Sequence, residues 1–247
     1  MHRILALWAT PRSTSTAFEK AMSNRGDLRC FHEPYNEAYY YGEDRRHDRY
    51  YVADPGLAIS EGLTIGGVHE KLVTLASSEP VFVKDFAYSI IHMADGALLD
   101  SMTHTFLIRD PDKVITSMYS RWQDITLSEI GFEELHTLFK RVSDRTGETP
   151  VVIDSDELLA NPNGVIKSYC EAVGLPFLKG ALNWEKSDKN PTWNTDEHGF
   201  HDALKASTGL KPQERSYPAL ESSPDMLRLY RASLPHYEAL LSFKLSA

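Results

Sequence analysis

The chemistry-bearing residues nearest the start of the chain combine one positive charge with four consecutive hydroxyl groups. An arginine carries a permanent charge and several N–H donors in a fixed fork. The first turn of a following helix adds unpaired N–H groups and the positive end of the helix dipole. A loop that gathers these groups binds anions, so it predicts a cradle for a phosphate or sulfate group. Its residues are Arg12, Ser13, Thr14, Ser15 and Thr16.

A strand and a helix must hold this loop. The apolar run 4–8 is typical of a buried strand, and Pro11 ends it. Serine and threonine favour helix N-caps, so we expect the helix to begin among residues 13–16. A loop that only caps a helix would explain the stretch equally well. The glycines and the lysine of a Walker A motif are absent, which argues against an ATPase or GTPase.

A second candidate anion site follows a later strand. Arg109 stands directly after the apolar run 103–108, and Ser117 lies on the helix that we expect next. Asp110 and Pro111 suit the cap and the first turn of that helix. A surface arginine and a helix serine would give the same pattern. Two anion sites at neighbouring strand ends nevertheless predict one ligand with two separated anionic groups.

Strands alternate with helices over most of the chain, which predicts a parallel sheet with helices on both faces. The expected fold is α/β, a three-layer, doubly wound and mostly parallel sheet whose ligands sit at the carboxyl ends of the strands. The further predicted strands are 28–32, 80–84 and 150–154, and the predicted helices are 69–77, 90–99, 111–123, 129–145 and 161–173. We expect a single domain over 1–247, with a nucleotide-binding α/β core over 1–180. Residues 181–247 would form an irregular segment and a last helix over 224–243.

The composition narrows the setting in which the protein works. The 247 residues carry a net charge of −9, which argues against a nucleic-acid or anionic-membrane partner. Two cysteines, Cys30 and Cys170, make no disulfide framework and no metal-ligand pattern. The opening apolar run is too short for a signal peptide, and no run is long enough to span a membrane. We therefore expect a cytoplasmic protein.

These motifs resemble the sulfotransferases that use 3′-phosphoadenosine 5′-phosphosulfate. Residues 10–16, TPRSTST, resemble the family's 5′-phosphosulfate loop, usually written PKSGTT or PRSGTT. Arg109 and Ser117 resemble its 3′-phosphate motif, and residues 151–177 resemble a later section that ends in Gly-Leu-Pro-Phe. The resemblance covers most of residues 1–180. It implies a P-loop NTPase-like fold, 3′-phosphoadenosine 5′-phosphosulfate as cosubstrate, no metal, and a small-molecule acceptor that receives the sulfuryl group on a hydroxyl or amine.

The chain departs from the family pattern at three places. Thr14 stands where the family usually has glycine, which predicts a loop that closes less tightly. Phe86 stands at the position of the catalytic histidine in the cytosolic branch's Lys-Thr-His stretch, and it cannot take a proton. The late Arg-Lys-Gly element is not evident, and Lys205, Lys211 and Arg215 are the candidates to replace it. These departures favour a divergent bacterial or fungal branch.

The resemblance also implies roles for the charged residues. Arg12 and the start of the helix would stabilise the leaving phosphate, and Lys84 would stabilise the transferring sulfuryl group. Arg109 and Ser117 would hold the 3′-phosphate.

A base is needed for the acceptor, and we favour Glu33 because it follows the second strand close to the phosphate loop. Glu33 could instead only pair with Arg12 or another cation. His32 is the competing base, and His92 is a weaker third choice.

Aromatic side chains are the candidates for an acceptor pocket. The segment 35–51 is rich in tyrosine, and we interpret it as a mobile lid over the site or as an irregular loop. Ordinary packing would use the same rings. The candidates are Tyr35, Tyr39, Tyr40, Tyr41, Trp122, Trp184 and Trp193.

Two other functions use the same first loop. A P-loop-type small-molecule kinase would need a lysine in that loop and a metal-binding carboxylate. A non-catalytic nucleotide-binding protein would keep the pocket without the chemistry, and Phe86 is the residue that favours it. We expect the enzyme, because Glu33 offers a substitute base.

Overall fold

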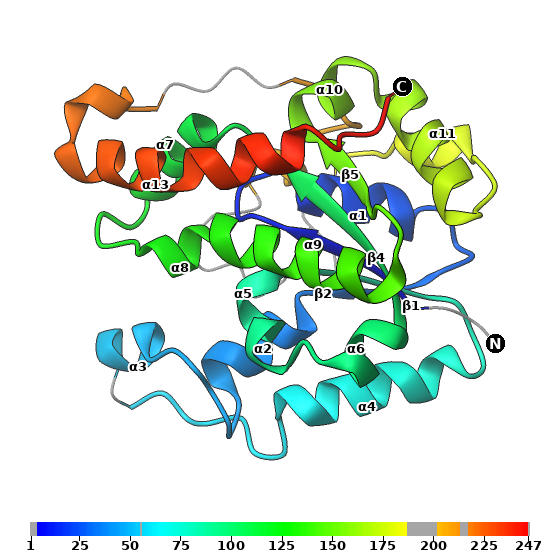
Figure 1. Ribbon diagram of the computed structural model, residues 1–247, viewed down its shortest axis with the longest axis horizontal. Helices are drawn as coiled ribbons and strands as arrows, with labels where there is room; N and C mark the ends of the chain where they lie inside the picture. The colour runs from blue at the N-terminus through cyan, green and yellow to red at the C-terminus, as the bar shows by residue number, and fades with distance from the viewer. Residues whose placement is uncertain (1–3, 55, 187–201, 213–216, 247) are drawn as a thin grey trace.

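The computed structural model describes residues 4–54, 56–186, 202–212 and 217–246. In this part of the chain the strands form one sheet in the order β2-β3-β1-β4-β5, and every neighbouring pair is parallel (Figure 1). This confirms the predicted doubly wound α/β fold, with each predicted strand in place. The strands are β1 (Ile4–Ala9), β2 (Arg29–His32), β3 (Val81–Phe86), β4 (Met102–Ile108) and β5 (Val151–Asp154).

Helices cover both faces of the sheet (Figure 1). The predicted helix over 90–99 is divided into short pieces, and the one over 129–145 is interrupted at Gly131, whose φ is 77°. The helices are α1 (Ser15–Ser23), α2 (Pro34–Tyr41), α3 (Arg49–Ala53), α4 (Ile65–Ala76), α5 (Ala87–Ile90), α6 (Gly96–Asp100), α7 (Pro111–Tyr119), α8 (Leu127–Ile130), α9 (Phe132–Thr146), α10 (Ser155–Ala160), α11 (Pro162–Val173), α12 (Asp202–Lys205) and α13 (Pro224–Leu241). Short 3₁₀ helices are η1 (Ile91–Met93), η2 (Lys179–Leu182) and η3 (Leu220–Ser222).

The alternation of side chains along β1 builds two separate cores. Ala6 and Trp8 pack on the face covered by α2, α4, α9 and the end of α13. Leu5 and Leu7 pack on the opposite face, against α1 and α11. Because successive residues of a strand point to opposite faces, the continuous apolar run of β1 is what a strand buried on both sides requires.

The parallel register brings the strand ends together at one edge of the sheet. Ala9, the last residue of β1, lies opposite Phe86 of β3 and Leu107 of β4. The loops that follow these strands therefore leave the sheet side by side. They are the hydroxyl-rich loop after β1, the residues that follow Phe86 of β3, and the turn after β4 that contains Arg109.

The segment 35–51 is more regular than the prediction of an irregular loop. Its first half is α2, where Tyr35, Tyr39 and Tyr40 are buried, and its end belongs to α3. Pro34 suits the first turn of α2, and the Asp85 carboxylate accepts the backbone N–H groups of Tyr35 and Asn36 at 2.7 and 3.3 Å. Tyrosine supplies the apolar surface that a conventional helix pattern would take from leucine.

The last helix confirms the prediction over 224–243. Ser223 accepts the N–H of Met226 as its N-cap, and the helix runs from Pro224 to Leu241. Beyond it the chain turns back to the sheet, where the Leu245 N–H donates to the Val152 carbonyl at 2.7 Å. None of the helices described is long and apolar enough to cross a membrane.

Candidate active site

The hydroxyl-rich loop, residues 10–16, is held in a strained conformation. Arg12 and Thr14 have φ values of 61° and 74°, in the left-handed region that favours glycine. The third non-glycine residue with positive φ in the described ranges is Glu33, at 49°. Strain of this kind costs about 1–3 kcal/mol per residue and persists where the surrounding structure enforces it. All three strained residues lie at the strand ends where the sequence predicts the site.

Contacts inside the loop explain why it keeps this shape. Ser13 is fully buried and donates its hydroxyl to the Thr10 carbonyl at 2.6 Å. The hydroxyls of Thr14 and Ser155 share a hydrogen bond of 2.8 Å, which ties the loop to α10. The Thr14 side chain therefore has a partner that the glycine usual at this place would lack.

The second predicted anion site lies directly against the first. The Arg109 guanidinium donates to the Arg12 carbonyl at 2.7 Å, and Arg12 Nε donates to the Ser117 hydroxyl at 3.0 Å. Ser117 is almost fully buried. Arg109 lines the cavity described next, whereas Ser117 supports Arg12 from behind.

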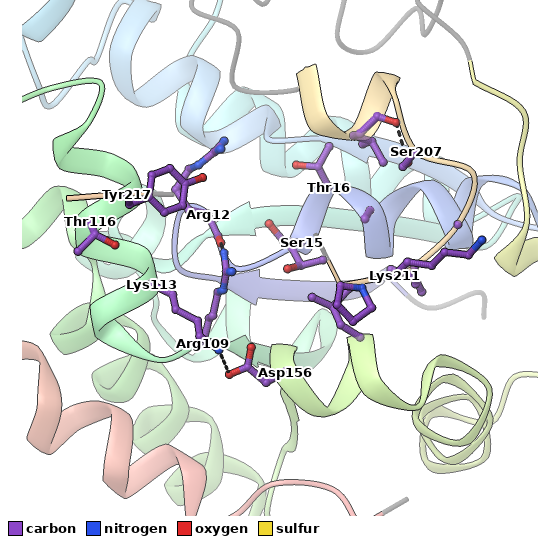
Figure 2. A pocket seen from close by; sticks show the side chains of 17 residues that line it. Arg12, Ser15, Thr16, Arg109, Lys113, Thr116, Asp156, Ser207, Lys211 and Tyr217 are labelled. Carbon is purple, nitrogen blue, oxygen red and sulfur yellow. Dashed lines mark hydrogen bonds and ion pairs between the residues drawn. The ribbon is translucent and has the colours of Figure 1, made fainter. Parts of the chain in front are cut away.

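A first cavity of about 340 Å³ opens beside the loop (Figure 2). Lys113 of α7 and Asp156 of α10 form an ion pair of 2.7 Å at its wall. Of the late basic candidates, Lys211 lines the cavity, Lys205 on α12 does not, and Arg215 is outside the described residues. Eleven of the seventeen residues that line the cavity are polar or charged, namely Arg12, Thr14, Ser15, Thr16, Arg109, Lys113, Thr116, Asp156, Ser207, Lys211 and Tyr217.

A second, smaller cavity of about 120 Å³ lies on the other side of the loop. Glu33 and Asn36 contribute its polar groups, and Arg12, Ser15 and Thr16 line it as well as the first cavity. The rest of its wall is mainly aromatic, made by Tyr40, Tyr50, Phe86, Tyr88 and Trp122.

The wall of the second cavity also holds a carboxylate whose negative charge is balanced by an arginine. Glu129 pairs with Arg49, whose guanidinium lies 5.0 Å from the centre of the Trp122 ring. Burial acts to raise the pKa of Glu129, but hydrogen bonds from Arg49 and Thr126 outweigh it and lower that pKa. Burial raises the pKa of Tyr40 and Tyr88, so both phenols stay neutral.

Glu33 and Lys84 form a partly buried ion pair near the carboxyl end of β3. Lys84 is fully buried, its amine contacts the Glu33 carboxylate, and it lies 5.2 Å from the centre of the Phe86 ring. Asn36 donates to the other Glu33 oxygen at 3.1 Å and accepts from the Tyr88 hydroxyl at 2.9 Å. These contacts aim one carboxylate, with 19% of its side chain exposed, into the second cavity.

The two histidines considered as bases lie in different places. His32 ends β2, with Nδ1 2.6 Å from Glu19 and Nε2 3.6 Å from Glu33. It does not line either of the two cavities described so far. His92 lies exposed on η1, away from both cavities.

Sequence reasoning considered Asp85 only as a possible metal ligand of a kinase, and the structure gives it a different part. It is fully buried behind Glu33, where it accepts backbone N–H groups of Tyr35 and Phe86, each at 2.7 Å. Burial, followed by the charge of Glu33, raises the Asp85 pKa to about 7. By capping α2 it fixes the turn that carries Glu33. A signal was present, because Pro34 predicts a helix start that needs a nearby acceptor.

The aromatic candidates separate into two groups. Tyr40 and Trp122 line the second cavity. Tyr35, Tyr39 and Tyr41 do not line it, and Trp184 packs near α11 while donating to the Ser207 hydroxyl at 2.9 Å. Trp193 is outside the described residues. Among the described residues, no three His, Cys, Asp or Glu side chains gather closely enough to hold a metal ion.

The comparisons with known proteins agree with this geometry. The family model for the sulfotransferase domain matches residues 2–244, so the chain belongs to the sulfotransferase domain family. Its structure is similar to the sulfotransferase domain from the Synechococcus PCC 7002 olefin synthase, with a TM-score of 0.52 and 14% identity over 99% of this chain and 96% of that one. It is also similar to the sulfotransferase domain from the curacin biosynthetic pathway, with a TM-score of 0.50 and 13% identity over 100% and 99%. These structural likenesses confirm the P-loop-like sulfotransferase fold.

The curated relatives are longer proteins. They are the branched-chain-amino-acid aminotransferase-like proteins 2 and 1 of Arabidopsis thaliana, each 24% identical to this chain over 97% of its length. The match covers 43% of each relative, so the chain spans less than half of their length.

Proposed function

We propose that this protein moves a sulfuryl group from 3′-phosphoadenosine 5′-phosphosulfate to a hydroxyl or amine of a small molecule. One observation carries the proposal: Arg12, Ser15 and Thr16 line both cavities. A donor in the first cavity and an acceptor in the second would therefore meet at the same loop. Group transfer between two bound molecules needs this arrangement, because it turns an encounter in solution into a reaction between positioned atoms.

The residues of the first cavity fit a doubly anionic donor. Its volume of about 340 Å³ lies within the range of roughly 300–1,000 Å³ usual for ligand sites. The loop and the start of α1 would hold the 5′-phosphosulfate, which supplies the sulfuryl group and a phosphate leaving group. Arg109, Lys113 and Lys211 would hold the 3′-phosphate, while Ser117 keeps Arg12 in place.

The residues between the cavities perform the steps that transfer requires. Glu33 takes the acceptor's proton, because it is the carboxylate aimed into the second cavity beside the loop. Arg12 and the N–H groups of α1 stabilise the charge that develops on the leaving phosphate. Lys84 holds the Glu33 carboxylate in position. Its positive charge also stabilises negatively charged oxygen atoms beside Glu33.

The second cavity limits the acceptor. A cavity of about 150 Å³ in another protein holds benzene, so a cavity of about 120 Å³ favours an acceptor whose buried part is at most one ring or a short chain. Aromatic walls and paired carboxylates favour an uncharged acceptor. The chain carries a net charge of −9, which disfavours nucleic acid and anionic membranes as partners. We further propose a cytoplasmic enzyme that acts on small molecules.

Calorimetric titration with adenosine 3′,5′-bisphosphate, with and without magnesium and beside ATP, tests the donor site. We expect metal-independent binding of the bisphosphate that is weakened by Arg109→Ala, and much weaker binding of ATP. Preference for magnesium-ATP would favour a kinase and refute the proposal.

Turnover of 3′-phosphoadenosine 5′-phosphosulfate tests the reaction, with benzyl alcohol, benzylamine and 4-nitrophenol as single-ring probes. Glu33→Gln is expected to lower kcat by roughly a hundredfold with benzyl alcohol. The loss should be smaller with 4-nitrophenol, whose hydroxyl ionises readily. Tight bisphosphate binding without turnover of any probe would point to a non-catalytic nucleotide-binding protein.

A further inference from the structure

Glu19 is a buried carboxylate that the proposed reaction leaves unused. It lies on α1, about one turn beyond the start of that helix, and only 2% of it is exposed. An ionised carboxylate at this depth is expensive unless it has a partner. Its Oε2 lies 2.6 Å from Nδ1 of His32.

His32 links this carboxylate to the candidate base. A carboxylate at Nδ1 keeps a proton on that nitrogen and sets the orientation of the ring. The other nitrogen, Nε2, then faces Glu33 at 3.6 Å from Oε1. This separation exceeds a hydrogen bond, and Oε1 also contacts the Lys84 amine. A small rotation of the Glu33 carboxyl, once it has taken the acceptor's proton and its attraction to Lys84 is weakened, completes the contact.

Glu33 and His32 open onto different spaces. Glu33 lines the second cavity, whereas His32 lines a third cavity of about 810 Å³ that runs along the edge strand β2 and the start of α4. A proton that leaves Glu33 through His32 therefore reaches water without crossing the space that the acceptor occupies.

We propose that Glu19 is a positioning residue for a proton relay that runs from Glu33 through His32 to the third cavity. The proposal rests on the proposed function. As the acceptor's O–H bond breaks, its proton joins Glu33, an O–S bond forms, and the donor's bond between sulfur and the phosphate oxygen breaks. The proton then moves from Glu33 to Nε2 of His32. Glu19 stabilises the resulting imidazolium until water in the third cavity takes the proton.

Three variants test the relay: Glu19→Gln, His32→Ala and the control Glu70→Gln, which removes an exposed charge on α4. With benzyl alcohol, the first two are expected to lower kcat roughly tenfold or more, with acceptor KM changed less than about twofold. Their affinity for adenosine 3′,5′-bisphosphate should match that of the control, because neither residue lines the first cavity. 4-Nitrophenol should show a smaller loss.

Chemical rescue separates a relay from a structural role. His32→Ala leaves a space that opens to the third cavity, so added imidazole is expected to restore its turnover and not that of Glu33→Gln. The His32 Nδ1–H proton resonance should move upfield in Glu19→Gln, because a neutral acceptor makes a weaker hydrogen bond.

Wild-type kcat in His32→Ala would overturn the relay, and so would a loss that imidazole does not reverse. If the protein binds the bisphosphate but turns over no acceptor, the proposed reaction fails and the relay with it. The Nδ1–H resonance still reports the contact between Glu19 and His32 in that case.

Discussion

The pair of Glu33 and Lys84 makes a quantitative prediction, because Lys84 is fully buried while 19% of the Glu33 side chain is exposed. Removing one partner of a buried pair leaves an unpaired charge and costs about 3–5 kcal/mol. Gln at position 33 keeps an oxygen that accepts a hydrogen bond. We therefore expect Glu33→Gln to lower the free energy of unfolding by about 3 kcal/mol, at the low end of that range.

Lys84→Met should cost less, because the Glu33 carboxylate that it leaves unpaired reaches solvent. The double variant should lose less than the sum of the single variants, by about 2 kcal/mol, because no unpaired charge remains in it. Urea unfolding followed by circular dichroism measures all four proteins. For Glu33→Gln the midpoint should fall by roughly 1 M, given a slope of about 2–3 kcal/mol per M.

Additivity of the two single variants within about 0.5 kcal/mol would refute this account of the pair. A change in the urea slope would instead show that the variant alters the unfolding transition itself. The same measurement controls the kinetic test, because an activity lost in Glu33→Gln counts as catalytic only in protein that is folded at the assay temperature.

Three further predictions concern the loop, its support and the core. Thr14→Ala keeps the strained φ of 74° and loses the hydrogen bond to Ser155, whereas Thr14→Gly loses that bond but releases the strain. Urea unfolding should therefore show the glycine variant to be more stable than the alanine variant by about 1 kcal/mol. The reverse order would contradict the strain at position 14. Ser117→Ala should weaken adenosine 3′,5′-bisphosphate and adenosine 5′-phosphosulfate by the same factor in calorimetry, because Ser117 acts through Arg12, and a selective loss of the bisphosphate would show direct contact with the 3′-phosphate. Burial lowers the pKa of His104 from 6.5 to about 4, so the unfolded state binds more protons between these values and stability is lost as the pH falls through them, by up to roughly 3 kcal/mol. His104→Gln keeps an acceptor for Trp8 Nε1 and should flatten this acid slope, and an unchanged slope would refute the assignment.

The sequence was informative where a local rule decides the outcome. The apolar run of β1, with Pro11 after it and N-cap residues next, has one consistent reading as strand, loop and helix. The parallel arrangement followed from alternation, and it placed Arg12, Glu33 and Arg109 at one edge of the sheet. The pairing of Glu33 with Lys84 joins residues on different elements, and only the packed sheet brings them together.

What the sequence did not reveal has physical causes as well. Tyrosines in 35–51 carry both apolar surface and a hydroxyl, so the pattern did not reveal that α2 is buried. Ser117 lies on α7 at the expected spacing from Arg109, but spacing does not show that its hydroxyl faces the Arg12 side chain. Lys113 and Asp156 are ordinary surface residues in sequence, and they become site residues because α7 and α10 flank the same cavity.

The shared wall between the first and second cavities has a thermodynamic consequence. Arg12, Ser15 and Thr16 belong to both, and Arg12 is restrained by Arg109 and Ser117. A ligand in either cavity that shifts this loop changes the affinity of the other cavity, and linkage requires the two effects to be equal. The coupling factor between a bound nucleotide and a bound acceptor analogue must therefore be the same whichever is added first. Its size measures how far a single strained loop makes two binding sites behave as one.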